Sequence, residues 1–282
     1  MNDRSVPRRH DRRRVLGSLA AAVIGVPLAI TGWASAESRP TTAANTAAAA
    51  QLLWSPNPSQ DGLKAFEGIE ADRAGIHPGR KYIYVEGDHY RFDIYKDDRD
   101  STGGGDRQRT ESKGMVANGK ALKMHDGETW TISYEMYMPS TLHGTSKFTH
   151  IFQLKTPATN GGPWVTLDLS RSGSTEKLRA RAYSTSGAPD IASTNLSPLR
   201  DKWITVEWTI TPGSKGTAKF VARNGTGSDA PVVASGSLSN VKVPDEDDYV
   251  RPKWGIYRSI ESASSDIIDT HLLIRNYKAS RA

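Results

Sequence analysis

The feature that most constrains the fold is a series of short segments rich in β-branched and aromatic residues, each bounded by Gly, Pro, Asn, Asp or Ser. In Trp130–Met138 and Trp203–Thr211, large apolar residues recur at every second position. This period is typical of strands with one buried face, whereas helical periodicity is limited to Gly62–Gly68 and Ser259–Ser265. Strands are predicted at Lys81–Glu86, His89–Tyr95, Arg107–Lys113, Trp130–Met138, Phe148–Lys155, Trp164–Ser170, Lys177–Tyr183, Trp203–Thr211, Thr217–Arg223, Pro231–Ser237, Lys253–Arg258 and Ile267–Tyr277.

A succession of strands without helices between them argues against parallel α/β folds. It favours an all-β fold, an antiparallel β-sandwich of the jelly-roll, concanavalin-like type. We predict that one domain spans residues 52–282, which is long enough to bury a large core.

The first 36 residues are predicted to be a signal peptide. Arg12–Arg14 precede an apolar stretch, Val15–Trp33, and Ala34–Ala36 offer small residues for cleavage. The paired arginines resemble the twin-arginine type, although Asp11 stands where Ser or Thr is usual. Residues 37–51 are of low complexity and are predicted to be a flexible linker. We therefore expect a secreted, extracellular protein with no membrane span after cleavage.

Most of the positive charge belongs to this leader. The whole chain has a formal net charge of +6. Residues 1–36 contain six arginines and two aspartates, so about +2 remains on the mature protein. The high isoelectric point is therefore weak support for nucleic-acid binding. The chain has no cysteine, which excludes disulfides, thiolate metal sites and a cysteine nucleophile.

The segment Arg107–Lys113 is too charged for an ordinary core strand. In a strand, Arg107, Arg109, Glu111 and Lys113 would share one face. Three cations and one carboxylate there are costly unless water covers them or an anion binds. A solvated edge strand, kept charged against aggregation, and an anion-binding face are both compatible with the pattern.

A second segment, Phe148–Lys155, favours the anion-binding interpretation. Strand parity puts Gln153 and Lys155 on one face and His150 on the other. An amide donor and an ammonium group on one face suit a carboxylate ligand. The alternative is an ordinary half-exposed strand.

A third segment, Lys253–Arg258, places Lys253, Gly255 and Tyr257 on one face. A glycine inside a strand can mark the close approach of a ligand to the backbone. A tyrosine beside cations can donate or accept a proton. The alternative is an aromatic core strand.

In order and spacing, the three segments resemble the jelly-roll polysaccharide lyases, which include alginate lyases of family seven, glucuronan lyases of family twenty and heparin-lyase-like relatives. In the alginate lyases the corresponding segments read Arg-Ser-Glu-Leu-Arg, Gln-Ile-His and Tyr-Phe-Lys-Ala-Gly-x-Tyr. The matching positions are Arg109, Glu111 and Lys113, then Gln153 and Lys155, then Lys253, Gly255 and Tyr257. Lys155 stands where that pattern has a catalytic His, which favours another branch, such as the glucuronan-lyase-like one.

The resemblance implies β-elimination on a uronic-acid polymer, an anionic polysaccharide, with no cofactor required. Arg109, Gln153 and Lys155 would neutralise the substrate carboxylate. Tyr257 would transfer protons, and Glu111 would orient the arginines. The expected substrate-binding residues are Arg107, Glu111, Lys113, Lys253, Arg258, His89 and His143, of which the two histidines could supply an imidazole.

Other functions fit less well or remain open. A glycoside hydrolase needs two facing carboxylates, and the nearest stretch, Glu86–Arg91, lacks the second. A non-catalytic carbohydrate-binding sandwich could use the same basic face, and a cell-surface interaction domain is a third possibility. Aspartates 97, 98, 100 and 106, or the run 245–248, offer oxygen ligands for a structural Ca²⁺. We expect a monomer.

Overall fold

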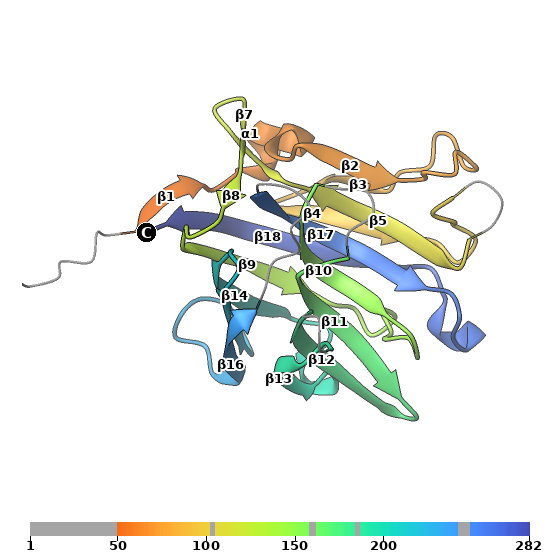
Figure 1. Cartoon of the computed structure of the whole chain (residues 1–282). Coiled ribbons are helices and arrows are strands. Elements are labelled where there is room, and N and C mark those ends of the chain that lie inside the picture. Colours follow the sequence, from red (N-terminus) through yellow and green to blue (C-terminus); the bar gives the residue numbers. More distant parts are fainter. Residues whose placement is uncertain (1–49, 102–104, 158–161, 184–186, 242–248) are drawn as a thin grey trace, which may run out of the picture. The chain divides into compact units, whose positions relative to one another are not determined.

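The computed structural model describes residues 50–101, 105–157, 162–183, 187–241 and 249–282, most of which lie in two antiparallel β-sheets (Figure 1). The predicted jelly-roll sandwich is thereby confirmed. The predicted signal peptide, and the predicted linker up to residue 49, lie outside the described residues. In the described ranges, no helix is long and apolar enough to cross a membrane.

Sheet A has eight strands. Their order is β16 (Val232–Val241), β15 (Gly216–Arg223), β14 (Trp203–Thr211), β9 (Trp130–Tyr137), β18 (Thr270–Arg281), β4 (His89–Ile94) and β3 (Ile83–Glu86), with β1 (Gln51–Trp54) also paired to β18.

Sheet B also has eight strands. Their order is β13 (Asp190–Asn195), β12 (Thr175–Ala182), β11 (Val165–Ser172), β10 (Thr149–Lys155), β17 (Tyr249–Ser259), β5 (Arg107–Lys113) and β2 (Gly68–Ala71), with β8 (Met124–His125) also paired to β17. The remaining elements are a hairpin of β6 (Met115–Ala117) and β7 (Lys120–Leu122), a short helix α1 (Pro58–Asp61), and the 3₁₀ turns η1 (Gly62–Ala65), η2 (Ser197–Leu199) and η3 (Ser264–Asp266).

Each of the twelve predicted strands corresponds to a strand of the structure. Six strands are additional, namely β1, β2, β6, β7, β8 and β13. These are short or polar, and β1, β2 and β13 lie at sheet margins where backbone pairing, rather than a buried side-chain pattern, defines them. The two predicted helical turns appear as η1 and η3.

The core between the sheets is rich in aromatic residues. Phe152 of β10 stacks on Trp208 of β14 and Tyr134 of β9, with ring centroids 5.2 and 6.1 Å apart. Trp254 of β17 meets Tyr277 of β18 edge-on at 5.0 Å. Aromatic side chains bury large apolar areas, so these contacts hold the two sheets together.

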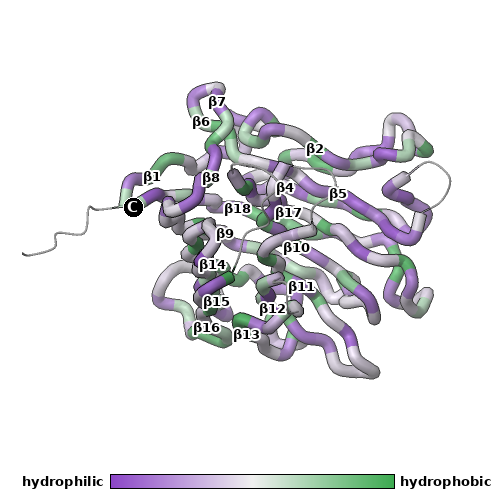
Figure 2. Tube along the Cα trace, viewed as in Figure 1, coloured by the Kyte–Doolittle hydropathy of each residue, from purple (hydrophilic) through white to green (hydrophobic). Residues whose placement is uncertain are grey.

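Along the strands, hydrophobic residues alternate with hydrophilic ones (Figure 2). In β9 and β14 the apolar residues are buried in the core and the residues between them are only partly buried. In β5 the same alternation points its charged residues away from the core. The outer face of sheet B therefore carries the charged segments singled out above.

Candidate active site

Strand β17 brings the three charged segments together, because it pairs with β10 on one side and β5 on the other. Tyr257 lies opposite Arg109 of β5 and His150 of β10. Lys253 lies opposite Gln153. Strand parity could only suggest that the three charged segments meet. The register of β17 with β10 and β5 brings them together.

Glu111 is the centre of this group. It is fully buried and accepts hydrogen bonds from Arg109 Nη1 at 2.6 Å, Lys253 Nζ at 2.7 Å and Gln153 Nε2 at 2.5 Å. Burial by itself raises the pKa of a carboxyl, but the charges of Lys253 and Arg109 outweigh this and lower the pKa of Glu111. Glu111 is therefore an ionised anchor that holds three side chains, of which Arg109 is the one arginine.

Two further carboxylates balance the cations. Glu70 of β2 accepts hydrogen bonds from Lys253 at 2.8 Å and Lys113 at 3.3 Å. Burial raises the pKa of Glu70, but Lys253 and the neighbouring cations lower it to about 2. Asp100 holds the Arg109 guanidinium at 3.0 and 3.2 Å. The sequence interpretation counted one carboxylate on this face, whereas the fold adds two.

Tyr257 lies at the edge of the charged group. Its hydroxyl accepts a hydrogen bond of 2.9 Å from Arg107 Nη1, and the Arg109 guanidinium lies over its ring, 3.7 Å from the centroid. The ring of Phe148 is 5.1 Å away on another side. The two arginines can stabilise negative charge that develops on the phenolic oxygen during proton transfer.

The prediction that His150 faces away from Gln153 is wrong, because β10 carries a bulge. Its register with both neighbouring strands shifts by one residue between His150 and Phe152, with the extra residue on β10 in the pairing with β11 and on β17 in the pairing with β17. A one-residue shift reverses side-chain parity, so His150 comes to the same face as Gln153. There its Nδ1 lies 2.6 Å from Asp168 Oδ1, and its ring centroid lies 5.9 Å from that of Tyr257.

A hollow of about 490 Å³ opens beside the buried centre. Lys155, which was expected to assist at the substrate carboxylate, lies in its wall. Six of the residues that line the hollow are basic and one is acidic, namely Arg73, Arg109, Lys113, Lys155, Arg251 and Lys253, with Glu70. The surroundings therefore suit an anionic ligand.

Arg258 was predicted to line the groove, and this prediction is wrong. Its side chain is fully buried and donates to Gln108 Oε1 at 2.8 Å and to the carbonyl oxygen of Ile268 at 2.8 Å. Burial lowers the pKa of Arg258 to about 10. Successive strand residues point to opposite faces, so Arg258 faces inward because Tyr257 faces outward.

The two histidines that could supply an imidazole have carboxylate partners outside the charged group. His89 is on β4 of sheet A, where Asp88 and Glu86 contact its ring nitrogens at 3.0 and 3.2 Å. His143 lies in the loop before β10, with Nδ1 3.4 Å from Glu176 Oε1. Neither makes a recorded contact with Tyr257 within the described ranges. His89 therefore lies on the other sheet, whereas the role of His143 stays a prediction, because a loop position cannot be read from a histidine's place in the sequence.

A glycine is needed at position 255 for strand packing, and not for ligand approach as the sequence suggested. Its φ is +133°, and a Cβ at this position would lie 2.1 Å from the carbonyl oxygen of Thr110. The glycine therefore allows β17 to approach the backbone of β5, rather than that of a ligand.

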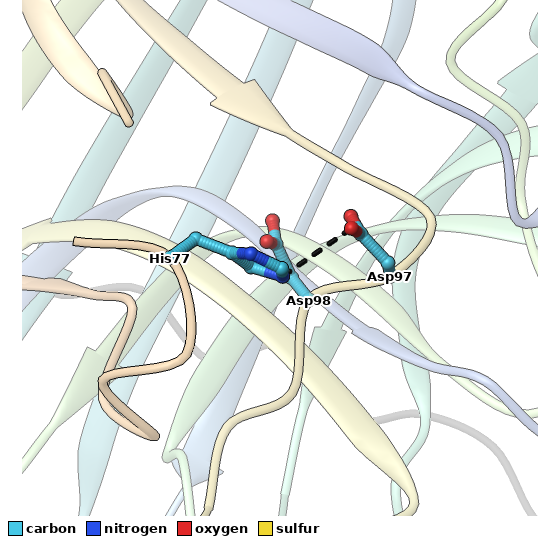
Figure 3. A group of neighbouring side chains, drawn as sticks. All are labelled: His77, Asp97 and Asp98. Atoms are coloured by element: carbon cyan, nitrogen blue, oxygen red, sulfur yellow. Dashed lines mark ion pairs between the residues drawn. The ribbon is translucent and has the colours of Figure 1, made fainter. Parts of the chain in front are cut away.

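Asp97 and Asp98 do meet His77, in the arrangement that Figure 3 shows. His77 Nε2 lies 3.3 Å from Asp97, and Arg80 binds both carboxylates at 2.8 and 3.1 Å. A cation would have to displace the Arg80 guanidinium, so the donor set fits an ion-pair cluster better than a Ca²⁺ site.

The other aspartates of the calcium prediction divide into two groups. Asp100 and Asp106 are held by Arg109 and Arg107, respectively. The run 245–248 lies outside the described residues.

Sequence reasoning missed Glu70, Asp100 as a partner of Arg109, and Asp168. For Asp168 a signal exists, because it is the single charged residue within the apolar run Val165–Leu169. Such a residue in a buried strand calls for a partner. For Glu70 no pattern points to the site, since β2 is short and pairs with β5 from a distant part of the chain.

Comparison with known proteins places the fold among the jelly-roll β-sandwiches of polysaccharide lyases. The sequence matches no family model and no curated protein. Among solved structures, it resembles alginate lyase A1-II′, a member of polysaccharide lyase family 7, with a TM-score of 0.56 and 12% identity over 80% of this chain and 99% of that chain. A complex of a variant of this lyase with product gives a TM-score of 0.55 and 13% identity over 81% and 100%.

The alginate lyase AlyA1 from Zobellia galactanivorans has 15% identity over 83% of this chain and 95% of that chain, at a TM-score of 0.46. At the identities of A1-II′ and its complex, the likeness establishes a shared fold. The activity has to be argued from the site.

Proposed function

We propose that the protein is a polysaccharide lyase that cleaves an anionic, uronate-containing polymer by β-elimination. The observation that carries the proposal is the meeting of Arg109, Gln153 and Tyr257 on the outer face of sheet B, beside a basic hollow. A fold shared with an alginate lyase supports it.

The reaction requires three contributions from the protein: stabilisation of the substrate carboxylate, a base and an acid. The C5 proton of a uronate is weakly acidic while the neighbouring carboxylate is ionised, so hydrogen bonds and positive charge at that carboxylate must stabilise the enolate-like intermediate. A base must take the C5 proton, and an acid must protonate the departing O4. In this proposal side chains neutralise the carboxylate, so no cofactor takes part.

Different residues are assigned to these three contributions. Arg109 and Gln153, aligned by Glu111, would bind the reacting carboxylate. Tyr257, supported at its hydroxyl by Arg107, would transfer a proton. Lys155 and the other basic residues of the hollow would hold carboxylates of neighbouring sugars, with partial screening by salt.

Residue identity at position 155 bears on the substrate. Because Lys155 stands where the alginate-lyase pattern has His, a glucuronan-like polymer is the preferred substrate within the uronate class. We further propose that the leader exports the protein to the extracellular space, where such polymers occur, and that it acts as a monomer.

The first experiment incubates the mature protein with glucuronan, alginate, hyaluronan and heparin and follows the ultraviolet absorbance of unsaturated uronate ends. Growth with one polymer would identify both the elimination and its substrate. Tyr257→Phe should then lower turnover by about 10²–10⁴-fold and leave polymer binding nearly intact. Tyr84→Phe on β3 of sheet A is the matched control, because the Tyr84 hydroxyl bonds Asp93 rather than a site residue.

The outcomes separate two functions. If no polymer yields absorbance but one is retarded in an affinity gel, the protein is a carbohydrate-binding module. A binding module needs no proton-transfer tyrosine, so full activity in Tyr257→Phe would refute the assigned role of Tyr257.

A further inference from the structure

We infer that His150, held by Asp168, is the second proton-transfer group of the site and acts together with Tyr257. This inference rests on the proposed lyase function and deepens it. It relocates the imidazole from the position of Lys155 to the far side of Gln153 on the same strand.

The β-bulge in β10 sets the direction of the His150 side chain. It turns His150 onto the outer face, directly opposite Tyr257 in the pairing of β10 with β17. The His150 ring stacks on Phe148, with centroids 5.1 Å apart, and lies 5.9 Å from the Tyr257 ring. Bulges are over-represented next to active sites, where they redirect a side chain.

Asp168 sets the orientation and tautomer of the imidazole. Its Oδ1 lies 2.6 Å from His150 Nδ1, and only 4% of Asp168 is exposed. When Nδ1–H donates to this carboxylate, Nε2 is the nitrogen that takes up or releases a proton. A buried carboxylate behind a histidine is the arrangement that positions general acids and bases in other enzymes.

The charged and titratable groups around His150 come from four strands, β11, β12, β17 and β5. Asp168 on β11 touches it directly, and Arg181 on β12 lies 3.6 Å from the second oxygen of Asp168. Tyr257 on β17 faces it, with Arg107 bound to the Tyr257 hydroxyl. The imidazole thus contacts the carboxylate of Asp168, and its ring lies near the ring of Tyr257.

These two groups complete the proton balance of the elimination. One of them takes the proton from C5, and the electron pair of that C–H bond forms the double bond between C4 and C5. The C4–O4 bond breaks with its electron pair on O4, and the other group supplies the proton that O4 needs. No oxidant, reductant or further reactant enters the step.

The test compares His150→Gln with His271→Gln, a histidine on β18 of sheet A. Absorbance assays on the best polymer should show a loss of about 10²–10⁴-fold in kcat/KM for His150→Gln and none for His271→Gln. Retardation in an affinity gel should be unchanged for both. Added imidazole should restore part of the activity of His150→Ala.

Asp168→Asn separates positioning from folding. Replacing the carboxylate by an amide allows the wrong imidazole tautomer, so Asp168→Asn should lower kcat by more than it changes KM. A purely structural Asp168 would instead lower the free energy of unfolding without this selective loss of kcat.

The failures are distinguishable. An inactive wild-type protein overturns the proposed function and this inference with it. Active wild-type protein together with undiminished His150→Gln overturns the inference alone. A loss in His150→Gln that imidazole cannot rescue in His150→Ala, with no selective loss of kcat in Asp168→Asn, also overturns it.

Discussion

The two sheets share one core but present different outer faces. In sheet A, β9 and β14 alternate between buried and partly buried residues along their length. In sheet B, β10 is buried at every position from Thr149 to Leu154, and β17 at most of its positions. The outer face of sheet B is therefore filled by polar side chains that contact one another.

The charges on the two faces also differ in their surroundings. On sheet A, Arg275 pairs with Glu135 at 3.0 Å and with Asp88 at 2.7 Å, and 67% of the Asp88 side chain is exposed. On sheet B, Glu111 is fully buried beneath three donors. Exposed pairs contribute little, whereas a buried charge costs several kcal/mol unless it is fully paired. A fold selected for stability alone has no need of such a network, so its presence supports the functional role proposed for this face.

The largest expected effect comes from removing the central carboxylate. Glu111→Gln removes the fully buried carboxylate between Lys253 and Arg109 and leaves them only the more peripheral Glu70 and Asp100. This loss should cost about 3–5 kcal/mol in the free energy of unfolding. Asp88→Asn, at the exposed partner of Arg275 on the outer face of sheet A, should cost about 0–1 kcal/mol. Urea unfolding of both variants measures the difference, and equal costs would abolish the contrast between the sheets.

A slightly smaller effect is expected at Gly255. Gly255→Ala places a Cβ against the carbonyl of Thr110 in a backbone conformation that favours glycine, and should cost about 2–4 kcal/mol. Gly87→Ala, in an open turn of sheet A with φ of +59°, should cost about 1 kcal/mol. Thermal unfolding of the pair tests whether close approach of β17 and β5 is needed, and a tolerated Gly255→Ala would argue against it.

The pH dependence of stability should contain a contribution from Glu70. Its pKa is lowered from 4.5 to about 2, so its stabilising effect is complete above pH 4.5 and is lost as the pH falls toward 2. Glu70→Gln should therefore flatten the fall in unfolding free energy over this range. Glu86→Gln should change it less, because Glu86, whose pKa His89 lowers, is largely solvated. Urea titrations at several pH values would contradict this view if Glu70→Gln kept the wild-type slope.

The smallest effect concerns a residue in the wall of the hollow. Lys155→Gln should weaken polymer binding by about two- to five-fold, equivalent to roughly 0.5–1 kcal/mol, and the loss should shrink as salt is added. Lys219→Gln, an exposed change on β15 of sheet A, should leave binding unchanged. Affinity gels at two ionic strengths provide the comparison, and equal losses would mean that the basic hollow does not select the polymer.

Much of the site was predictable because strand parity is local. The alternation in Arg107–Lys113 correctly placed Arg109 and Glu111 on one face, and the same rule in Lys253–Arg258 placed Tyr257 with Lys253. Parity failed at His150, since a bulge depends on the register with neighbouring strands. The parity rule was not applied to Arg258. It would have placed this side chain in the interior between the sheets.

The sequence by itself determined the fold class, the twelve main strands and the charged segments, because apolar periodicity and residue type act over a few neighbouring positions. Only the tertiary structure decided which charges meet. Glu70, Asp100 and Asp168 reach the site through strand pairing and loops between distant parts of the chain, and a single-residue bulge sets the face of His150. Such long-range pairing is a property of the whole sandwich, so no local pattern encodes it.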